Sequence, residues 1–180
     1  SLKKIELNDS LEKIDNCAFM NCTALRQIKI PESVTTIGAS CFSNCDALDE
    51  ITIPTSVKLI GPGAFYKCKQ LEEIEIPSSI TEINDSTFYN CSHLKKIIIP
   101  PSVESIKDKA FAFCSDLVDC QIPESVNSIE SDVFAGCSKI EKVEIPPNVT
   151  KIENGTFADC KSLKVVVIPP SVKSIGKFAF

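Results

Sequence analysis

A repeat of 23 residues runs through the whole chain and constrains its fold more than any other feature. Proline and phenylalanine both keep this spacing, at Pro31, Pro54, Pro77, Pro100, Pro123, Pro146 and Pro169, and at Phe19, Phe42, Phe65, Phe88, Phe111, Phe134, Phe157 and Phe180. Isoleucine does the same from Ile14 to Ile175. A register kept without insertion over 180 residues predicts a solenoid, in which each coil packs only on its two neighbours.

One coil shows where strands are expected. Residues 25–30 (LRQIKI) alternate apolar and polar side chains, which is typical of a strand with one buried face. Pro31 has no N–H group to donate to a sheet and therefore ends that strand. Val34 and Ile37 are the next apolar residues and are expected on the return side of the coil. Residues 39–45 should then close the coil as a tight turn or a short 3₁₀ segment.

The consensus L-x-x-I-x-I-P-x-S-V-x-x-I-x-x-x-A-F-x-x-C resembles the leucine-rich repeat of the BspA-like (Treponema-type) class, and the resemblance covers essentially the entire chain. It implies a leucine-rich repeat solenoid of the right-handed α/β-type horseshoe or arc class, with mostly short β-strands and 3₁₀ or turn segments. Residues 1–180 should form one such solenoid of about seven to eight coils. The chain begins late in a coil and stops in mid-coil without a polar cap, as expected for a segment of a longer protein.

Serine stands where leucine-rich repeats in general carry an asparagine. We expect its hydroxyl to bond to the backbone of the neighbouring coil, as the asparagine amide does elsewhere. The positions are Ser33, Ser56, Ser79, Ser102, Ser125 and Ser171, with asparagine only at Asn148.

Seven of the ten cysteines share one column of the repeat: Cys22, Cys45, Cys68, Cys91, Cys114, Cys137 and Cys160. A straight column does not converge on a metal ion, and parallel side chains hold their Cβ atoms too far apart for an unstrained disulfide. The one histidine, His93, lies in a column of variable residues and is not expected to activate a thiol. We expect buried thiols that pack as small apolar groups, with some disulfides as the alternative. No catalytic residue, metal ion or cofactor is expected, and no enzyme.

Charge and hydropathy exclude two classes of partner. The net charge is −5 and the basic residues are dispersed, so nucleic-acid binding is not expected. No apolar run reaches the roughly 18 residues that a membrane helix needs, so membrane insertion is not expected either. Asn-x-Ser/Thr triplets could accept glycans in a secreted eukaryotic protein. They stand at Asn8, Asn21, Asn84, Asn90, Asn148 and Asn154.

Two columns next to the buried strand residues should point outward, and we take them as the candidate binding surface for a protein partner. If the strands line a concave side, this surface comprises Gln27, Lys29, Glu50, Thr52, Glu73, Glu75, Lys96, Ile98, Asp119, Gln121, Lys142, Glu144, Val165 and Val167. Its middle is acidic, its far end is apolar with Val118 nearby, and it lacks aromatic residues. Unlike the core columns, these columns change chemistry from coil to coil.

The resemblance implies a non-catalytic protein–protein interaction scaffold at the cell surface or secreted, because BspA-like proteins of bacteria and parasitic protists are associated with adhesion to host matrix and cells. The alternative is an intracellular structural component of a cytoskeletal or other large assembly. The ten cysteines, if reduced, favour this alternative. The oligomeric state is left open.

Overall fold

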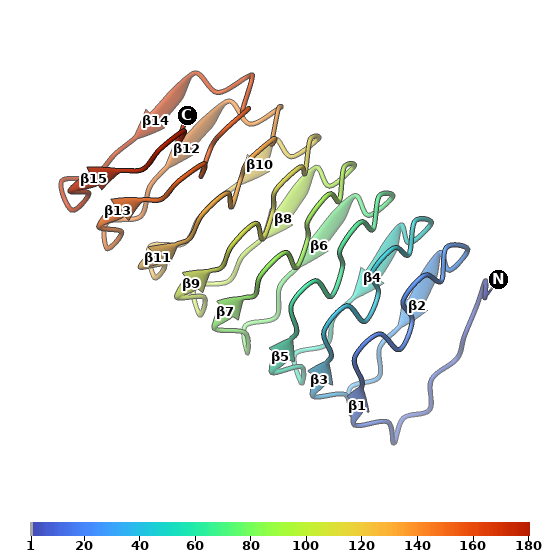
Figure 1. Ribbon diagram of the computed structural model, residues 1–180. Coiled ribbons are helices and arrows are strands. Elements are labelled where there is room, and N and C mark those ends of the chain that lie inside the picture. Colours follow the sequence, from blue (N-terminus) through green and yellow to red (C-terminus); the bar gives the residue numbers. More distant parts are fainter. Residues whose placement is uncertain (1) are drawn as a thin grey trace.

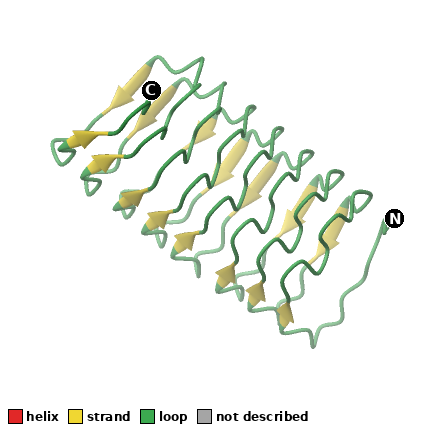
Figure 2. Ribbon diagram, in the orientation of Figure 1, coloured by secondary structure: helices red, strands yellow, loops and turns green. Residues whose placement is uncertain are grey.

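The computed structural model describes residues 2–180 as a stack of coils, each built from two short strands and a closing turn (Figures 1 and 2). The first strands of the coils are β2 (Gln27–Lys29), β4 (Glu50–Thr52), β6 (Glu73–Glu75), β8 (Lys96–Ile98), β10 (Asp119–Cys120), β12 (Lys142–Glu144) and β14 (Val165–Val167). The second strands are β1 (Lys13–Ile14), β3 (Thr36–Ile37), β5 (Leu59–Ile60), β7 (Glu82–Ile83), β9 (Ser105–Ile106), β11 (Ser128–Ile129), β13 (Lys151–Ile152) and β15 (Ser174–Ile175). The predicted solenoid is confirmed.

All strand pairs are parallel and join residues 23 positions apart, such as Ile28 with Ile51 and Ile14 with Ile37. The second row of strands was predicted only as a return side, and it is a row of strands of its own. Within residues 2–180 no helix is present, so turns take the place of the helical part of the α/β-type class. In this described part, therefore, no helix is long and apolar enough to cross a membrane.

Both rows of strands are interrupted at the same two places. The first row pairs as β2–β4, β6–β8–β10 and β12–β14, and the second row as β1–β3–β5, β7–β9–β11 and β13–β15. The described coils therefore fall into three hydrogen-bonded blocks, with one boundary between the coils of β4 and β6 and another between those of β10 and β12.

The closing turns form a third, uninterrupted side, which we call the turn ridge: residues 16–22 and their equivalents in each later coil. Two residues four positions apart have positive φ in most of these turns, for example Ser40 at 51° and Asn44 at 58°. Alternate N–H groups of the turn donate to the next coil, as in the 2.8 Å bond from the Phe42 N–H to the Ala64 carbonyl. The same bonds continue across the block boundaries, where the Phe65 N–H donates to the Thr87 carbonyl at 2.9 Å.

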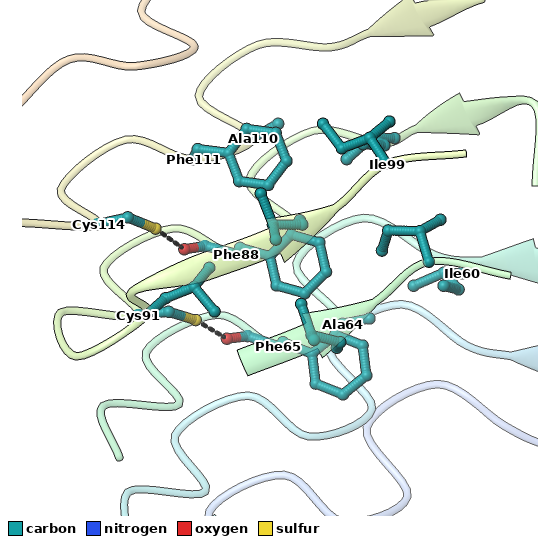
Figure 3. Close-up of a cluster of buried hydrophobic side chains, with 14 of the residues drawn as sticks. Ile60, Ala64, Phe65, Phe88, Cys91, Ile99, Ala110, Phe111 and Cys114 are labelled. Carbon is teal, nitrogen blue, oxygen red and sulfur yellow. Dashed lines mark hydrogen bonds between the residues drawn. The ribbon is translucent and has the colours of Figure 1, made fainter. Parts of the chain in front are cut away.

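The core lies between these three sides and is organised around one column of stacked phenylalanine rings (Figure 3). Ring centroids of successive coils lie 5.3 Å apart at the first pair, Phe19–Phe42, and 5.8 Å apart at the last, Phe157–Phe180. The rings from Phe42 to Phe157 are fully or almost fully buried. Columns of Leu, Ile and Val fill the space between this stack and the strands.

The cysteine column packs beside the phenylalanines and also donates hydrogen bonds. Each thiol from Cys45 to Cys160 donates to the carbonyl of the phenylalanine 26 residues earlier, for instance Cys91 to Phe65 at 3.1 Å (Figure 3). The column is fully buried from Cys45 to Cys137, and all ten cysteines are unbridged. The packing role predicted for this column is confirmed, whereas the S–H donors were not foreseen.

The serine column makes the bonds that the sequence predicts. Ser33, Ser56, Ser102, Ser125 and Ser171 donate to the backbone carbonyl 22 residues earlier at 2.7–2.8 Å, and Ser79 donates to the Val57 carbonyl in the same way. Asn148 donates from its amide to the Glu124 carbonyl at 3.3 Å.

Candidate binding surface

The first row of strands exposes the two candidate columns on one face, which we call the outer strand face. Each three-residue strand buries or half-buries its central side chain and exposes the two that flank it. All fourteen candidate residues are exposed on this face, although Gln121 lies just beyond the two-residue strand β10. The period-2 alternation read from the sequence places them there.

Polar contacts on the outer strand face run between neighbouring coils. Gln27 donates from its amide to the Glu50 carboxylate at 3.1 Å. Lys96 is in register with Glu73 on one side and Asp119 on the other, so an acidic residue stands next to it on each neighbouring strand. Opposite charges on adjacent strands stabilise their pairing modestly. The middle of the face is thus acidic and carries a single lysine.

Apolar side chains occur at two separate places on this face. Val165 and Val167 on β14 are 49% and 47% exposed, and Ile98 on β8 is 45% exposed. Val118, 56% exposed, directly precedes β10. Charged residues such as Lys142 of β12 stand between these places, so the exposed apolar groups do not form one continuous patch.

A hollow of about 740 Å³ lies at the N-terminal end of the face, between residues 3–9 and strand β2. Ile5 and Leu7 are half-buried against the core, and Lys4 pairs with Glu6 at 2.8 Å. Arg26 and Lys29 line the opposite side. The hollow is therefore lined by side chains of mixed character, with a half-buried apolar floor.

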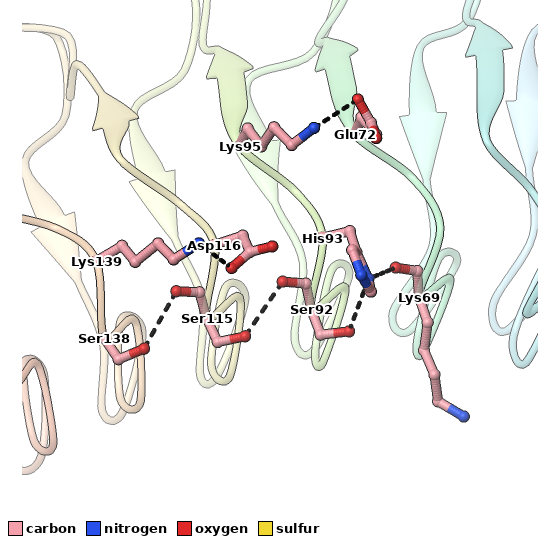
Figure 4. A network of polar contacts seen from close by, with 9 residues as sticks. All are labelled: Lys69, Glu72, Ser92, His93, Lys95, Ser115, Asp116, Ser138 and Lys139. Carbon is pink, nitrogen blue, oxygen red and sulfur yellow. Dashed lines mark hydrogen bonds and ion pairs between the residues drawn. The ribbon is translucent and has the colours of Figure 1, made fainter.

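The loops that lead into the first strands carry a second set of contacts (Figure 4). Lys95 pairs with Glu72 at 2.8 Å and Lys139 with Asp116 at 2.7 Å. His93 is exposed and its Nδ1 lies 2.7 Å from the Lys69 carbonyl oxygen. His93 thus contacts a backbone carbonyl rather than a thiol, as expected of a surface column.

Three carboxylates approach one another beyond the second row of strands. Oxygen atoms of Asp85, Asp108 and Glu130 lie within 4.8 Å of one another. The Lys107 ammonium group lies 3.0 Å from Glu130 and 3.1 Å from Glu82, and the bond to Glu130, followed by that to Glu82, raises the pKa of Lys107. This lysine already supplies a positive charge beside these carboxylates.

An aromatic cluster lies on the turn ridge. The sequence did not lead to its prediction, because the candidate binding surface was restricted to the outer strand face. The rings of Tyr66 and Tyr89 stack at 4.9 Å, and Phe113 meets Tyr89 edge-on at 5.4 Å. Phe113 is 45% exposed, has a positive φ of 62°, and lies over Gly136, where an added Cβ would stand 2.6 Å from its ring. The 23-residue spacing of the two tyrosines was the available signal.

Comparison with known proteins places the chain among leucine-rich repeat proteins. The family model of the BspA type leucine-rich repeat region matches residues 1–118 and 81–180, with six copies. A leucine-rich repeat protein from Bacteroides ovatus is 30% identical with a TM-score of 0.74, over 97% of this chain and 56% of that one. A leucine-rich repeat protein of T. pallidum is 28% identical with a TM-score of 0.62, over 92% of this chain and 67% of that one.

A leucine-rich cell surface protein from Faecalibacterium prausnitzii is 26% identical with a TM-score of 0.63, over 94% of this chain and 62% of that one. The chain thus spans between about half and two thirds of the length of these three structures. No curated protein sequence matches it. Leucine-rich repeat proteins are typically non-catalytic scaffolds for protein–protein interaction. Because the family model matches the chain along the chain's whole length, the chain belongs to the BspA type leucine-rich repeat family.

Proposed function

We propose that the chain is a non-catalytic scaffold that binds a protein partner on its outer strand face. The observation that carries this proposal is the contrast between columns: core positions repeat the same residue type, whereas the fourteen exposed positions change from acidic to basic to apolar. Packing does not dictate these fourteen residues, so they are available for recognition. Partner residues that match this face would be basic opposite Glu50, Glu73 and Glu75 and apolar opposite β14.

The absence of enzymatic activity is part of the same proposal. General acid–base or nucleophilic chemistry needs a partly desolvated group next to a second activating group. The buried thiols bond to backbone carbonyls, and burial raises the pKa of Cys91 and Cys114 well above that of an ordinary thiol. Such thiols stay protonated and are poor nucleophiles.

A location at the cell surface or outside the cell, with a role in adhesion, is our leading proposal. It is supported by the F. prausnitzii relative, which is described as a cell surface protein. Adhesion would use the outer strand face, because that face offers a long exposed surface. The ligand would then be a protein of the surface to which the cell attaches.

The second candidate is an intracellular structural component of a cytoskeletal or other large assembly. The observation in its favour is the set of ten unbridged cysteines, since disulfides usually form and persist in secreted proteins. Burial weakens this argument, because the thiols from Cys45 to Cys137 in the column are shielded from oxidants in any compartment.

Charge reversal on the outer strand face tests the binding proposal. The triple variant Glu50→Lys, Glu73→Lys and Glu75→Lys should lower binding to immobilised basement-membrane extract by about tenfold or more, since like charges would then face a basic partner. The matched control is Glu12→Lys, Glu104→Lys and Glu124→Lys, which changes the net charge equally at exposed positions away from this face. Equal binding by both variants would refute a role for the outer strand face.

The intact mass of native material separates the two locations. Ten alkylated thiols under denaturing conditions and no added sugar mass would favour the intracellular assembly. Attached glycans, or fewer than ten alkylated thiols, would support the secreted adhesion protein.

A further inference from the structure

The boundary between the coil of β4 and β5 and the coil of β6 and β7 lacks backbone bonds on two of its three sides; we call it the split boundary. Inside the blocks, the Gly61 N–H donates to the Ile37 carbonyl and the Lys107 N–H to the Ile83 carbonyl, at 2.8 and 2.9 Å. Among the described residues, no equivalent bond joins the Asn84 N–H to the Ile60 carbonyl, and β4 does not pair with β6. In Figure 1 the coil of β7 stands visibly off that of β5.

On the side of the second strands, the Asn84 side chain takes the place of a backbone bond. Gly38 and Gly61 occupy the column of Asn84, and a Cβ at either would lie 2.5 Å from a backbone nitrogen of the preceding coil. Lys107 and Glu130 stand in the same column and keep the backbone bond at 2.9 and 3.0 Å, so a side chain at this position does not by itself separate the coils. The side-chain amide of Asn84 instead donates to the Ile60 carbonyl at 2.8 Å. The side chain thus replaces the missing backbone donor across a wider gap.

Like charges face each other across the split boundary on the side of the first strands. Asp49 directly precedes β4 and Glu50 begins it. In the next coil the same two columns are occupied by Glu72 and Glu73. Like charges at facing positions of neighbouring strands destabilise their pairing. Asp49 turns to Arg26 and Glu72 to Lys95, so each ion pair stays within its own block.

A hollow opens on each of the two separated sides. One of about 250 Å³ is lined by residues 58–60, residues 80–82 and Asn84, and one of about 150 Å³ by Ile51, residues 73–75, Lys96 and Ile98. Both hollows are open to solvent. The two coils therefore have room to move toward each other on both sides.

The turn ridge keeps the two coils attached. Three of its backbone bonds cross the split boundary at 2.7–2.9 Å, from Gly63, Phe65 and Lys67 to the next coil. The rings of Phe65 and Phe88 keep a centroid distance of 5.4 Å, the same spacing as within the blocks. In the described residues the other polar and aromatic contacts across it come from side chains: the Asn84 amide, the Ser79 hydroxyl to Val57, the Cys91 thiol to Phe65, the stacked rings of Tyr66 and Tyr89, and the exposed pair Lys69–Asp46.

We propose that the split boundary is a hinge, at which the two blocks rotate about the turn ridge and open or close the outer strand face between Glu50 and Glu73. Two coils that are hydrogen-bonded to each other along one side and not along the other two can rotate only about the bonded side. The candidate binding residues Glu50 and Thr52 then move relative to Glu73 and Glu75, so the hinge would set the curvature offered to a partner. The hinge proposal does not depend on the proposed function.

Nuclear magnetic resonance of the unliganded chain tests the hinge directly. Motion between blocks falls in the microsecond–millisecond range and broadens nearby methyl signals. We expect relaxation dispersion at Ile51, Ile60, Ile74 and Ile83, which flank the split boundary, and none at Ile106, inside a block. The amide of Asn84 should exchange with solvent at least tenfold faster than that of Lys107. Equal dispersion or equal amide protection at both places would overturn the proposal.

A glycine variant tests the assigned cause. Asn84→Gly removes the side-chain amide that occupies the Ile60 carbonyl, so the backbone amide at position 84 should gain at least tenfold protection and the dispersion at Ile60 and Ile83 should fall. The matched control Lys107→Gly, inside a block, should leave dispersion at the split boundary unchanged. Unchanged dispersion in Asn84→Gly would overturn the role of this residue, and the wild-type measurement decides the hinge if the variant does not fold.

Discussion

At the scale of single residues, the buried thiols couple stability to alkaline pH. Burial is the main cause that raises the pKa of Cys41 and Cys45 to about 12, and it raises those of Cys68, Cys91, Cys114 and Cys137 well above that of an ordinary thiol. In the unfolded chain these thiols ionise near pH 8.5, so above this pH the unfolded state binds fewer protons than the folded state.

The free energy of unfolding should therefore be steady from pH 6 to 8 and fall as pH rises from about 8.5 toward 12, by up to about 1.4 kcal/mol per pH unit for each buried thiol. Urea unfolding at a series of pH values measures this. Cys91→Ala should reduce the slope, whereas Cys17→Ala, at an exposed position, should not. A slope that is the same in wild type and Cys91→Ala would contradict the argument.

The phenylalanine stack contributes more to stability than the thiol column. Phe88 is fully buried between Phe65 and Phe111. Phe88→Ala should lower the free energy of unfolding by about 3–5 kcal/mol, because it leaves a ring-sized cavity. Cys91→Ala, next to it, should cost only about 1–2 kcal/mol for a smaller group and one weak hydrogen bond. Urea titration of both variants checks the order, and a larger loss for Cys91→Ala would be inconsistent with it.

At the scale of the coil, the serine column links each second strand segment to the coil before it. The Ser102 hydroxyl donates to the Ile80 carbonyl at 2.7 Å and is half-buried. Ser102→Ala should lower the free energy of unfolding by about 1 kcal/mol, since a partly buried carbonyl loses its donor. The exposed Ser78 is a suitable control, and Ser78→Ala should change stability by less than about 0.5 kcal/mol. Equal losses in the two variants would argue against the hydrogen bond.

The repeat made the coil itself predictable, and the reasons are local. Alternation around Ile28, the strand-ending Pro31 and the bond from Ser33 each follow from residue type and spacing. The second strand at Thr36–Ile37 was read only as a return side, because two residues are too short to show a period. The block boundaries were not predictable, since they depend on how closely the backbones of neighbouring coils approach.

The candidate surface was predicted to the same extent as the strands that carry it. Exposure of the fourteen residues on one face follows from strand alternation, which the sequence contains. The division of this surface among three blocks does not follow from the sequence, because columns of residues 23 positions apart suggest one continuous face. The aromatic cluster of Tyr66, Tyr89 and Phe113 lies on the turn ridge, and Phe113 stands in the column after that of the two tyrosines, so a spacing of 23 residues does not connect it with them.

At the scale of the whole molecule, stability should be close to a sum of coils and of contacts between neighbouring coils. The blocks modify this sum, because the two boundaries between them lack the strand ladders that other boundaries have. A destabilising substitution inside one block should therefore unfold that block first. The phenylalanine stack and the turn ridge, which continue through the described coils, would carry the remaining coupling.

Deletion of one whole repeat tests whether the molecule is built from interchangeable coils. Removing residues 95–117, which are 23 residues, places Val118 after Leu94 and keeps every later phenylalanine, proline and cysteine in its column. We expect a folded protein with unchanged β-type circular dichroism and a modestly lower melting temperature, because one coil and its two contacts are replaced by a single new contact. Removing residues 95–116 instead shifts all later coils by one position, which would turn buried strand residues outward. This control should lose cooperative unfolding, and equal behaviour of the two deletions would show that the register of 23 does not hold the stack together.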